Sequence, residues 1–212
     1  MIVTVSGFIG SGKDTVSEYL QSIYGFQQIS FAGALKDAVS AIFGWDREML
    51  EGKTVESRYW RETKDIWWSE RLGMNITPRW ILQYWGTEVC RQGFHDDIWI
   101  ASVENRIRNN ARNVVISDAR FPNELATIKK LGGKSLMVVR GKNPDWYDLA
   151  IKANQGDSHA RAEIATIVHS SEWSWVGYDF DHIIDNNSDL ASLYAQVDRL
   201  INDRVLMDHQ SR

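Results

Sequence analysis

The stretch that decides the fold runs Ile2-Val3-Thr4-Val5-Ser6-Gly7-Phe8-Ile9-Gly10-Ser11-Gly12-Lys13-Asp14-Thr15. Its first residues predict a short buried strand over 2–6, and the residues from Asp14 to Ser22 predict the start of an amphipathic helix with Val16, Tyr19 and Leu20 facing inward. Between strand and helix lies the spacing G-x4-G-K, the P-loop pattern, whose glycines let successive backbone N–H groups turn toward phosphate oxygens. The stretch therefore predicts a phosphate-binding loop.

The residues expected to bind ATP all lie in this loop: Gly10, Ser11, Gly12, Lys13, Asp14 and Thr15. Lys13 is the first catalytic candidate, because a P-loop lysine reaches the β- and γ-phosphates and follows the charge during transfer. The pattern departs at Asp14, where a Ser or Thr hydroxyl usually ligates Mg²⁺. The Asp14 carboxylate is expected to bind Mg²⁺ directly or through water, since Mg²⁺ prefers oxygen ligands and keeps several waters. Thr15 could supply a hydroxyl to a phosphate instead.

A second candidate site follows the buried strand 114–116, in Ser117-Asp118-Ala119-Arg120. An acid at the carboxyl end of a strand beside the P-loop strand is where Mg²⁺ or its water is held in this kind of fold, and Asp118 is the candidate. Arg120 is expected to contact a transferring or accepting phosphate. The alternative is an ordinary Asp–Arg surface pair after a strand.

The rest of the chain alternates strands with helices, which predicts an α/β fold with one five-stranded parallel sheet, doubly wound, as in P-loop NTPases. Strands are predicted at 2–6, 28–31, 114–116, 135–139 and 182–184, and helices at 14–22, 34–43, 77–91, 95–110, 122–131 and 190–201. We expect a single domain over 1–212. Two segments interrupt the alternation: 46–76, expected to be an acceptor-site insertion, and 141–176, which is polar, has few signals of ordered structure and is expected to form a lid.

Composition limits the classes of function. The chain has 212 residues, a net charge of −4 and one cysteine, Cys90. The negative charge argues against a broad nucleic-acid surface, and a lone cysteine fits a reducing compartment. The N-terminus lacks the basic region of a signal peptide, and no apolar run approaches the ~20 residues of a membrane span. We therefore expect a cytoplasmic protein without membrane contact. Its ten tryptophans are expected mainly to pack cores, with stacking on a base as the alternative.

Several further stretches occur in a recognisable order. The P-loop with its Lys-Asp-Thr variant resembles that of the bacteriophage deoxynucleoside-monophosphate kinases, and so do the other stretches: Phe31-Ala32-Gly33-Ala34-Leu35-Lys36-Asp37-Ala38, Arg61-Glu62-Thr63, Leu82-Gln83-Tyr84-Trp85-Gly86-Thr87-Glu88, Trp99 and Ser117-Asp118-Ala119-Arg120. The resemblance covers nearly the whole chain and is weaker over 141–176. It implies transfer of a phosphate from ATP to a dNMP, giving dNDP and ADP, with Mg²⁺ as cofactor. It also implies a homodimer, and host cytoplasm as the location if a phage encodes the protein.

The resemblance also suggests an acceptor site for the dNMP. The matching positions are Leu35, Lys36, Arg61, Gly86, Thr87 and Trp99, with Arg79 as a weaker candidate. Charge and position add Arg120, and Arg140 after the strand 135–139. Arginine can grip a phosphate through two parallel hydrogen bonds, whereas lysine acts as a point charge. Each residue has a structural alternative: a solvated helix residue, a local ion pair or a core position.

Two other functions stay open. One is a related phage kinase that phosphorylates 5-hydroxymethyluracil in DNA, which would need a basic groove and stacking platforms. The other is a non-catalytic nucleotide-binding switch. Two short stretches have no settled role: His169-Ser170-Ser171-Glu172 resembles a family element without a chemical assignment, and Asp185-Asn186-Asn187-Ser188 could lie near adenine or form the turn before the last helix.

Overall fold

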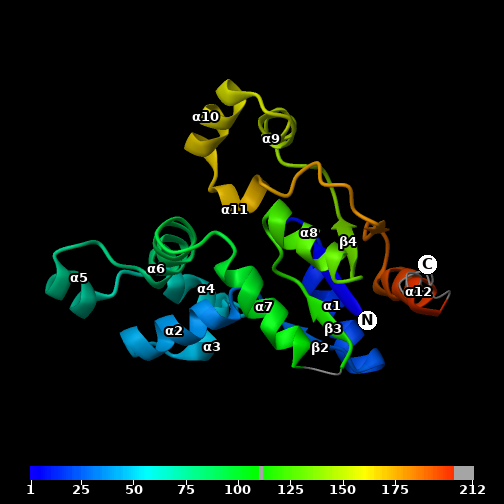
Figure 1. The fold of residues 1–212 in the computed structure, drawn as a ribbon, viewed down its shortest axis with the longest axis horizontal. Coiled ribbons are helices and arrows are strands. Elements are labelled where there is room, and N and C mark those ends of the chain that lie inside the picture. The colour runs from blue at the N-terminus through cyan, green and yellow to red at the C-terminus, as the bar shows by residue number, and fades with distance from the viewer. Residues whose placement is uncertain (110–111, 203–212) are drawn as a thin grey trace. The chain divides into compact units, whose positions relative to one another are not determined.

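The structure is a computed structural model that describes residues 1–109 and 112–202 (Figure 1). Its contacts group into two compact units: the first contains Met1–Ile29 and Ile107–Arg212, and the second is Ser30–Arg106. The second unit is therefore inserted in the chain between strands β2 (Gln27–Ile29) and β3 (Val114–Ile116). Whether the chain acts as the single domain expected from the sequence stays a prediction.

The first unit contains one five-stranded sheet in the order β2-β3-β1-β4-β5, with every neighbouring pair parallel. The other strands are β1 (Ile2–Ser6), β4 (Lys134–Val139) and β5 (His182–Asp185). The central strands β1 and β3 are almost wholly buried, as expected for a parallel sheet covered by helices on both faces. The predicted five-stranded parallel α/β fold is confirmed.

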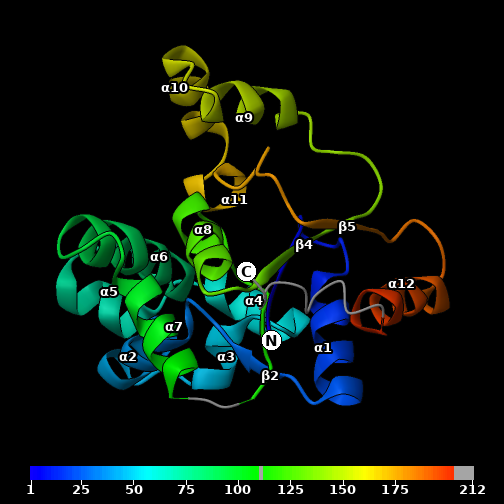
Figure 2. The same cartoon turned by 45° about the vertical axis from the view of Figure 1, so that its right-hand side comes forward.

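Helices cover both faces of this sheet. On one face, α1 (Lys13–Tyr24) and α12 (Leu190–Asn202) pack against each other and against the strands. Their side chains share a core with alternate strand residues: Val3, Val5, Val16, Leu20, Phe26, Val115, Leu136, Val138, Ile184, Leu193, Val197 and Ile201. Helix α8 (Pro122–Lys130) packs against β1 and β4 outside this core, and Figure 2 shows it on the opposite side of the strands from α1 and α12. The sheet is therefore covered by helices on both faces. Because all its strands are parallel, their carboxyl ends lie at the same edge of the sheet.

Three helices follow β4, where the sequence predicted little ordered structure. They are α9 (Tyr147–Asn154), α10 (Ser158–Ile167) and α11 (Ser170–Trp173) (Figure 1). The prediction was wrong because the buried residues that join α9 to α10 are mostly small, namely Ala150, Ala153, Ala160 and Ile164, and alanines give a weak hydrophobic pattern. Asp157 signals the start of α10, since its side chain accepts hydrogen bonds from the first backbone N–H groups.

The second unit is built from short helices: α2 (Gly33–Phe43), α3 (Arg47–Glu51), α4 (Val55–Glu62), α5 (Ile66–Leu72), α6 (Pro78–Tyr84) and the π-helix η1 (Trp85–Gln92). Helix α7 (Ile98–Arg108) is the last helix of this stretch of the chain, and its residues from Ile107 onward belong to the first unit. Side chains of Asp46, Thr54, Asp65 and Thr77 cap four of the helices. The predicted helix 77–91 is confirmed at its Thr77-Pro78 start but continues as a π-helix. The predicted helix 95–110 begins only at Ile98, and its expected end at Asn110 lies outside the described residues.

Most tryptophans of the second unit are structural. Its core contains Leu35, Val39, Phe43, Trp45, Leu50, Ile76 and Ile81, with Trp60, Trp68, Trp80, Trp85 and Trp99 packed around it. Several indole N–H groups have hydrogen-bond partners: Trp45 donates to Asp65 and Trp68 to the Phe43 carbonyl. A buried indole N–H usually has a hydrogen-bond acceptor, and these contacts supply it. Core packing therefore explains most of the tryptophans in this unit.

Candidate active site

The P-loop joins β1 to α1 in the first unit and curls over the carboxyl end of the sheet. Backbone hydrogen bonds from Ser11 N to Phe8 O and from Val16 N to Gly12 O, both 3.0 Å, close the curl and start the helix. Gly12 has a left-handed backbone with φ +96° at the helix N-cap, a conformation that favours glycine. A Cβ at Gly7 would lie 2.6 Å from the Val138 carbonyl oxygen. The backbone conformation at Gly12 and the close packing against Val138 at Gly7 therefore both favour glycine.

A residue far away in sequence holds the loop. The Asn186 side-chain amide, directly after β5, donates a 2.7 Å hydrogen bond to the Ser11 carbonyl. Asn186 is buried, and its own backbone N–H donates to the Val139 carbonyl. The side chain that accepts a hydrogen bond from Ser192 N in the first turn of α12 is that of Asp189, which lies after the 185–188 stretch. Asn186 of the 185–188 stretch therefore contacts the P-loop backbone, and a position of this stretch near adenine stays a prediction.

An open pocket lies at this loop. Its walls come from the P-loop, from the segment after β3 and from the end of the segment 141–176: Ser6, Gly7, Phe8, Ile9, Lys13, Ser117, Asp118, Ala119, Arg120, Glu172 and Trp175. Because β3 pairs directly with β1, the residues that follow the two strands meet at one edge. The structure therefore brings the three catalytic candidates, Lys13, Asp118 and Arg120, to a single pocket.

Two hydroxyls in the pocket region have no protein partner in the described part of the chain. The Oγ atoms of Ser6 and Ser11 are buried and make no hydrogen bond there. Buried polar atoms are normally satisfied, and a bound ligand or ion is one of the explanations for an exception. Together with the inward-facing P-loop, these hydroxyls fit a site that is completed by phosphate oxygens.

The residues predicted to hold Mg²⁺ also fit that ion. Asp118 lines the pocket, and Asp14 lies in the first turn of α1, with a carboxylate that is 70% exposed and 3.2 Å from the Lys13 ammonium. Within residues 1–109 and 112–202, no group of three or more His, Cys, Asp or Glu side chains could hold a metal. Mg²⁺ is commonly bound by one or two carboxylates together with substrate phosphates. The donor set is therefore suitable for a metal that arrives with a nucleotide.

Arg120 is held on two sides. Its backbone N–H and that of Phe121 donate to the buried carboxylate of Glu124, at 2.7 and 3.1 Å. Its guanidinium Nη1 lies 2.6 Å from Oε1 of Glu172 and donates to the Ser171 carbonyl at 3.4 Å. The segment 141–176 thus contributes a carboxylate to the pocket, a contact that links positions 52 apart in sequence.

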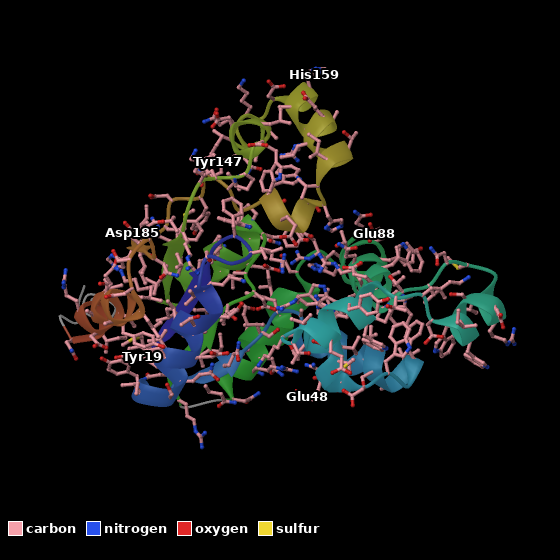
Figure 3. All side chains as sticks on the ribbon, turned by 180° about the vertical axis from the view of Figure 1, so that it is seen from behind. Tyr19, Glu48, Glu88, Tyr147, His159 and Asp185 are labelled. Atoms are coloured by element: carbon pink, nitrogen blue, oxygen red, sulfur yellow. The ribbon has the colours of Figure 1, made fainter. Side chains whose placement is uncertain are left out.

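Aromatic rings attach the same segment to the P-loop. Phe8 lies 4.7 Å from the Trp175 ring, 5.6 Å from Trp146 and 6.1 Å from Tyr147. Tyr147 begins α9 and is labelled in Figure 3, as is Asp185 at the end of β5. Trp175 is buried and also lines the pocket. Both ends of the segment expected to be a lid are thus packed against the loop in this structure.

The acceptor candidates other than Arg120 and Arg140 lie in the second unit. Leu35, Gly86 and Trp99 meet there: the Trp99 indole donates to the Gly86 carbonyl at 2.9 Å, and a Cβ at Gly86 would lie 3.0 Å from Leu35. Gly86 and Thr87 belong to η1, where Gly93 N donates to the Glu88 carbonyl five residues earlier. π-Helical turns are rare in proteins, and those that occur often lie at functional sites.

Lys36 and Arg61 lie around the end of α3. The Lys36 ammonium is 2.6 Å from the Glu51 carboxylate, and Arg61 Nη1 donates to the Leu50 and Glu51 carbonyls at 3.4 and 3.5 Å. Arg47 also pairs with Glu51. Burial alone would raise the pKa of Glu51, but the hydrogen bonds and charges of Lys36 and Arg47 lower it below its ordinary value. Glu51 is thus an ionised partner of a predicted phosphate ligand.

Two other acceptor candidates lie apart from these clusters. Arg79 lies 3.8 Å from the Glu62 carboxylate in the second unit. Arg140 is exposed directly after β4 in the first unit, beside Gly141, whose N–H donates to Asn187. Arg140 does not belong to the pocket lining. The ligand roles of all these residues stay predictions.

Sequence reasoning named the stretches that contain Asn186 and Glu172 but gave neither residue a contact, and it did not single out Glu124 or, in the second unit, Glu51. Glu124 had a usable signal, since Pro122 at the first helical position with an acid three residues after Phe121 is typical of a helix start. Asn186 and Glu172 contact residues that are distant in sequence, so the sequence did not show these contacts.

No helix in the described residues is long and apolar enough to span a membrane.

Comparison with solved structures returns kinases among its matches. The chain aligns with TT1252 from Thermus thermophilus at a TM-score of 0.47 and 16% identity, covering 96% of this chain and 97% of the other. For a shikimate kinase from Aquifex aeolicus the TM-score is 0.46 at 12% identity, with coverage of 98% and 99%. These scores are too low to carry a functional conclusion, and the fold assignment rests on the strand order and the P-loop.

Comparison with sequences is more informative. No protein-family model matches the chain. A protein provisionally described as a deoxynucleotide monophosphate kinase, from Acanthamoeba polyphaga mimivirus, is 34% identical over 154 residues, which cover 66% of this chain and 74% of the relative. The deoxynucleoside-5′-monophosphate kinase of Escherichia phage T5 is 29% identical over 174 residues, covering 58% of this chain and 70% of the relative. The P-loop, the parallel sheet and these relatives agree, and the chain belongs to the deoxynucleoside monophosphate kinase family.

Proposed function

We propose that this protein transfers the γ-phosphate of ATP to a deoxynucleoside monophosphate. The observation that carries the proposal is the single pocket in which Lys13 of the P-loop faces the segment with Asp118 and Arg120 after the neighbouring strand. In the reaction, an oxygen of the acceptor phosphate bonds to the γ-phosphorus while the bond from that phosphorus to the β–γ bridging oxygen breaks. The products are a dNDP and ADP.

The pocket residues supply positive charge and position. Lys13 binds the β- and γ-phosphates and stays with the transferring group, while the P-loop N–H groups cradle the phosphate oxygens. Arg120 donates to the transferring or accepting phosphate. Phosphoryl transfer needs little covalent help from the protein, so charge stabilisation and in-line placement account for catalysis. Asp118, and Asp14 directly or through water, would hold Mg²⁺, which neutralises charge on the phosphates when bound.

For the acceptor, the proposal assigns the predicted positions Leu35, Lys36, Arg61, Arg79, Gly86, Thr87, Trp99 and Arg140. The convergence of Leu35, Gly86 and Trp99, and of Lys36 and Arg61 near Glu51, supports two parts of one binding region within the second unit. A homodimer and a location in the cytoplasm, or the host cytoplasm, complete the proposal. The family resemblance supports the homodimer, and the single cysteine, which fits a reducing compartment, supports the location.

The experiment is an assay of ADP release from Mg-ATP with a panel of acceptors. The panel contains each dNMP, each NMP, the 5-hydroxymethyl dNMPs, and DNA with and without 5-hydroxymethyluracil. Turnover with one or more free dNMPs supports the proposal and defines the base specificity. Turnover on modified DNA alone would favour the DNA-base kinase, and ATP binding without turnover on any acceptor would favour a nucleotide-dependent switch.

A further inference from the structure

The ion pair between Arg120 and Glu172 is the contact that connects the segment 141–176 to the predicted chemistry. Oε1 of Glu172 lies 2.6 Å from Nη1 of Arg120, and both residues line the P-loop pocket. The Glu172 side chain is 22% exposed and that of Arg120 is 42% exposed. A long side chain with this much solvent access would sample many rotamers without a partner. The carboxylate therefore limits where the guanidinium can go.

The His169-Ser170-Ser171-Glu172 element is built to present that carboxylate. Helix α11 has only four residues, and His169 is its N-cap. Ser171 N donates to His169 Nδ1 at 3.3 Å, and Ser171 Oγ lies 2.9 Å from the same nitrogen. The turn thus points two acceptors at Arg120, the Glu172 carboxylate and the Ser171 carbonyl. The 169–172 turn therefore fixes where these two acceptors lie relative to Arg120.

The contacts on Arg120 divide between its two ends. Glu124 holds the backbone of the Arg120–Phe121 turn against α8, whereas Glu172 and Ser171 contact only Nη1. A guanidinium carries further N–H donors in a fixed plane. Both hydrogen bonds that the guanidinium makes to described residues are at Nη1, so the plane is oriented while its other N–H groups can face a phosphate in the pocket. Glu172 can keep its contact while Arg120 binds substrate.

We propose that Glu172 is a positioning residue, which holds the Arg120 guanidinium in the orientation that contacts substrate phosphate, and that His169 sets Glu172 in place. The inference rests on the proposed function, because it gives Arg120 a phosphate contact. It assigns the 169–172 element to the active site as a support for Arg120, and it makes the end of the segment 141–176 a part of the catalytic pocket.

The first test compares Glu172→Ala, Glu172→Gln and the control Glu163→Gln in the ADP-release assay. Glu163 is an exposed carboxylate on α10, so its substitution removes the same charge from the same segment. We expect Glu172→Ala to lower kcat by about tenfold to a hundredfold, since small misplacements of catalytic groups cost that much. Glu172→Gln, which keeps an acceptor oxygen, should lose less, and Glu163→Gln should match wild type. Melting temperature and affinity for a non-hydrolysable ATP analogue should change little in all three.

The second test uses guanidinium ion as a substitute for the lost side chain. Millimolar guanidinium should restore part of the activity of Arg120→Ala, because Glu172 still offers a carboxylate to hold the ion. In the double variant Arg120→Ala/Glu172→Ala the restoration should be at least several-fold weaker. His169→Ala should resemble Glu172→Ala, and His169→Asn should recover activity because asparagine is a good N-cap. A purely structural role would lower the melting temperature without these differences in rescue.

Equal kcat in Glu172→Ala and Glu163→Gln, with equal guanidinium rescue in the single and double variants, would overturn the inference. If wild type phosphorylates no dNMP, the proposed function fails. The contact between Arg120 and Glu172 is then tested by NMR, which does not depend on activity. The Arg120 Nε–Hε signal, assigned from its loss in Arg120→Lys, should broaden and exchange faster with water in Glu172→Gln than in Glu163→Gln. An unchanged signal would contradict the positioning role without any reference to turnover.

Discussion

The buried side-chain amide of Asn186 donates a 2.7 Å hydrogen bond to the backbone carbonyl of Ser11, and so the turn after the last strand holds the phosphate-binding loop after the first. These residues are 175 positions apart. The contact lies directly beside Gly12, where a Cβ would come within 2.3 Å of the Asn186 nitrogen. The shape of the loop therefore depends on β5 as well as on its own glycines, and this dependence can be tested.

Replacing Asn186 should loosen the loop. Asn186→Ala leaves the Ser11 carbonyl without its donor, which should lower the free energy of unfolding by about 1–3 kcal/mol. Because the P-loop then samples other conformations, KM for ATP should rise several-fold while KM for the dNMP changes little. Thermal unfolding and steady-state kinetics measure both. Asn187→Ala, which removes the neighbouring amide that contacts Gly141, is the control. A variant of Asn186 with unchanged KM for ATP would contradict the role.

Gly12→Ala tests the same contact from the other side. The substitution combines a strained φ of +96° with the clash against Asn186, so turnover should fall by at least tenfold. Adding Asn186→Ala should restore part of the activity, since it removes the clashing atom. Gly25→Ala is the matched control, because Gly25 also has positive φ but nothing within 4 Å of the added Cβ. Full additivity of Gly12→Ala and Asn186→Ala would mean that the clash is not what limits this position.

The acceptor assignment predicts a separation of kinetic effects. Lys36→Ala and Arg61→Ala should raise KM for the dNMP or lower kcat by about tenfold or more while leaving ATP-analogue affinity unchanged. Arg58→Ala is the control for Arg61, since Arg58 is an exposed arginine on the same helix α4. Melting temperatures are needed beside the kinetics, because Arg61 also contacts the end of α3. Equal loss of ATP affinity would remove both residues from the acceptor site.

The ionised Glu51 carboxylate should make the free energy of unfolding depend on pH. Its pKa is lowered from the ordinary 4.5, with burial opposing the shift and Lys36 and Arg47 causing it. A carboxyl with a depressed folded pKa stabilises the fold above its unfolded pKa, and this stabilisation is lost as pH falls through the folded pKa. Glu51→Gln should therefore destabilise the protein by about 1 kcal/mol near neutral pH, a modest amount because the Glu51 side chain is still 24% exposed to solvent. The difference should shrink on going to about pH 3.

Urea unfolding of wild type and Glu51→Gln at both pH values measures this difference. Glu70→Gln, an exposed carboxylate on α5, should show little difference at either pH. A stability gap between wild type and Glu51→Gln that stays constant or grows on acidification would contradict the assignment of Glu51 as an ionised partner of Lys36.

Local signals explain what could be predicted from sequence. The P-loop, the strand ending at Ile116 and the acid Asp118 were found because a short buried run, a glycine pattern and a helix start lie next to one another in the chain. The five strands followed from the alternation of apolar runs and helical patterns. The short helices α3 to α5 were missed although Asp46, Thr54 and Asp65 are good N-caps, because helices this short have little hydrophobic periodicity.

Long-range contacts explain what could not be predicted. Asn186 and Ser11, and Arg120 and Glu172, meet only after the sheet has formed, so neither pair leaves a local pattern. The π-helix that contains Gly86 and Thr87 follows α6 directly, so the sequence pattern was interpreted as one ordinary helix. The helices in 141–176 pack through alanines, which carry a weak hydrophobic signal. Tertiary packing therefore decided the features that sequence patterns left open.

Transfer of the γ-phosphate from ATP to a dNMP is tested most directly with a labelled phosphate. γ-Labelled ATP is incubated with wild type and a dNMP that is active in the acceptor panel, with Lys13→Ala as the catalytic variant and Lys130→Ala, at the exposed end of α8, as the control. We expect the label to move to the dNDP with wild type and Lys130→Ala, and Lys13→Ala to transfer it at least a hundredfold more slowly. Label released only as inorganic phosphate, or transferred equally well by Lys13→Ala, would contradict it.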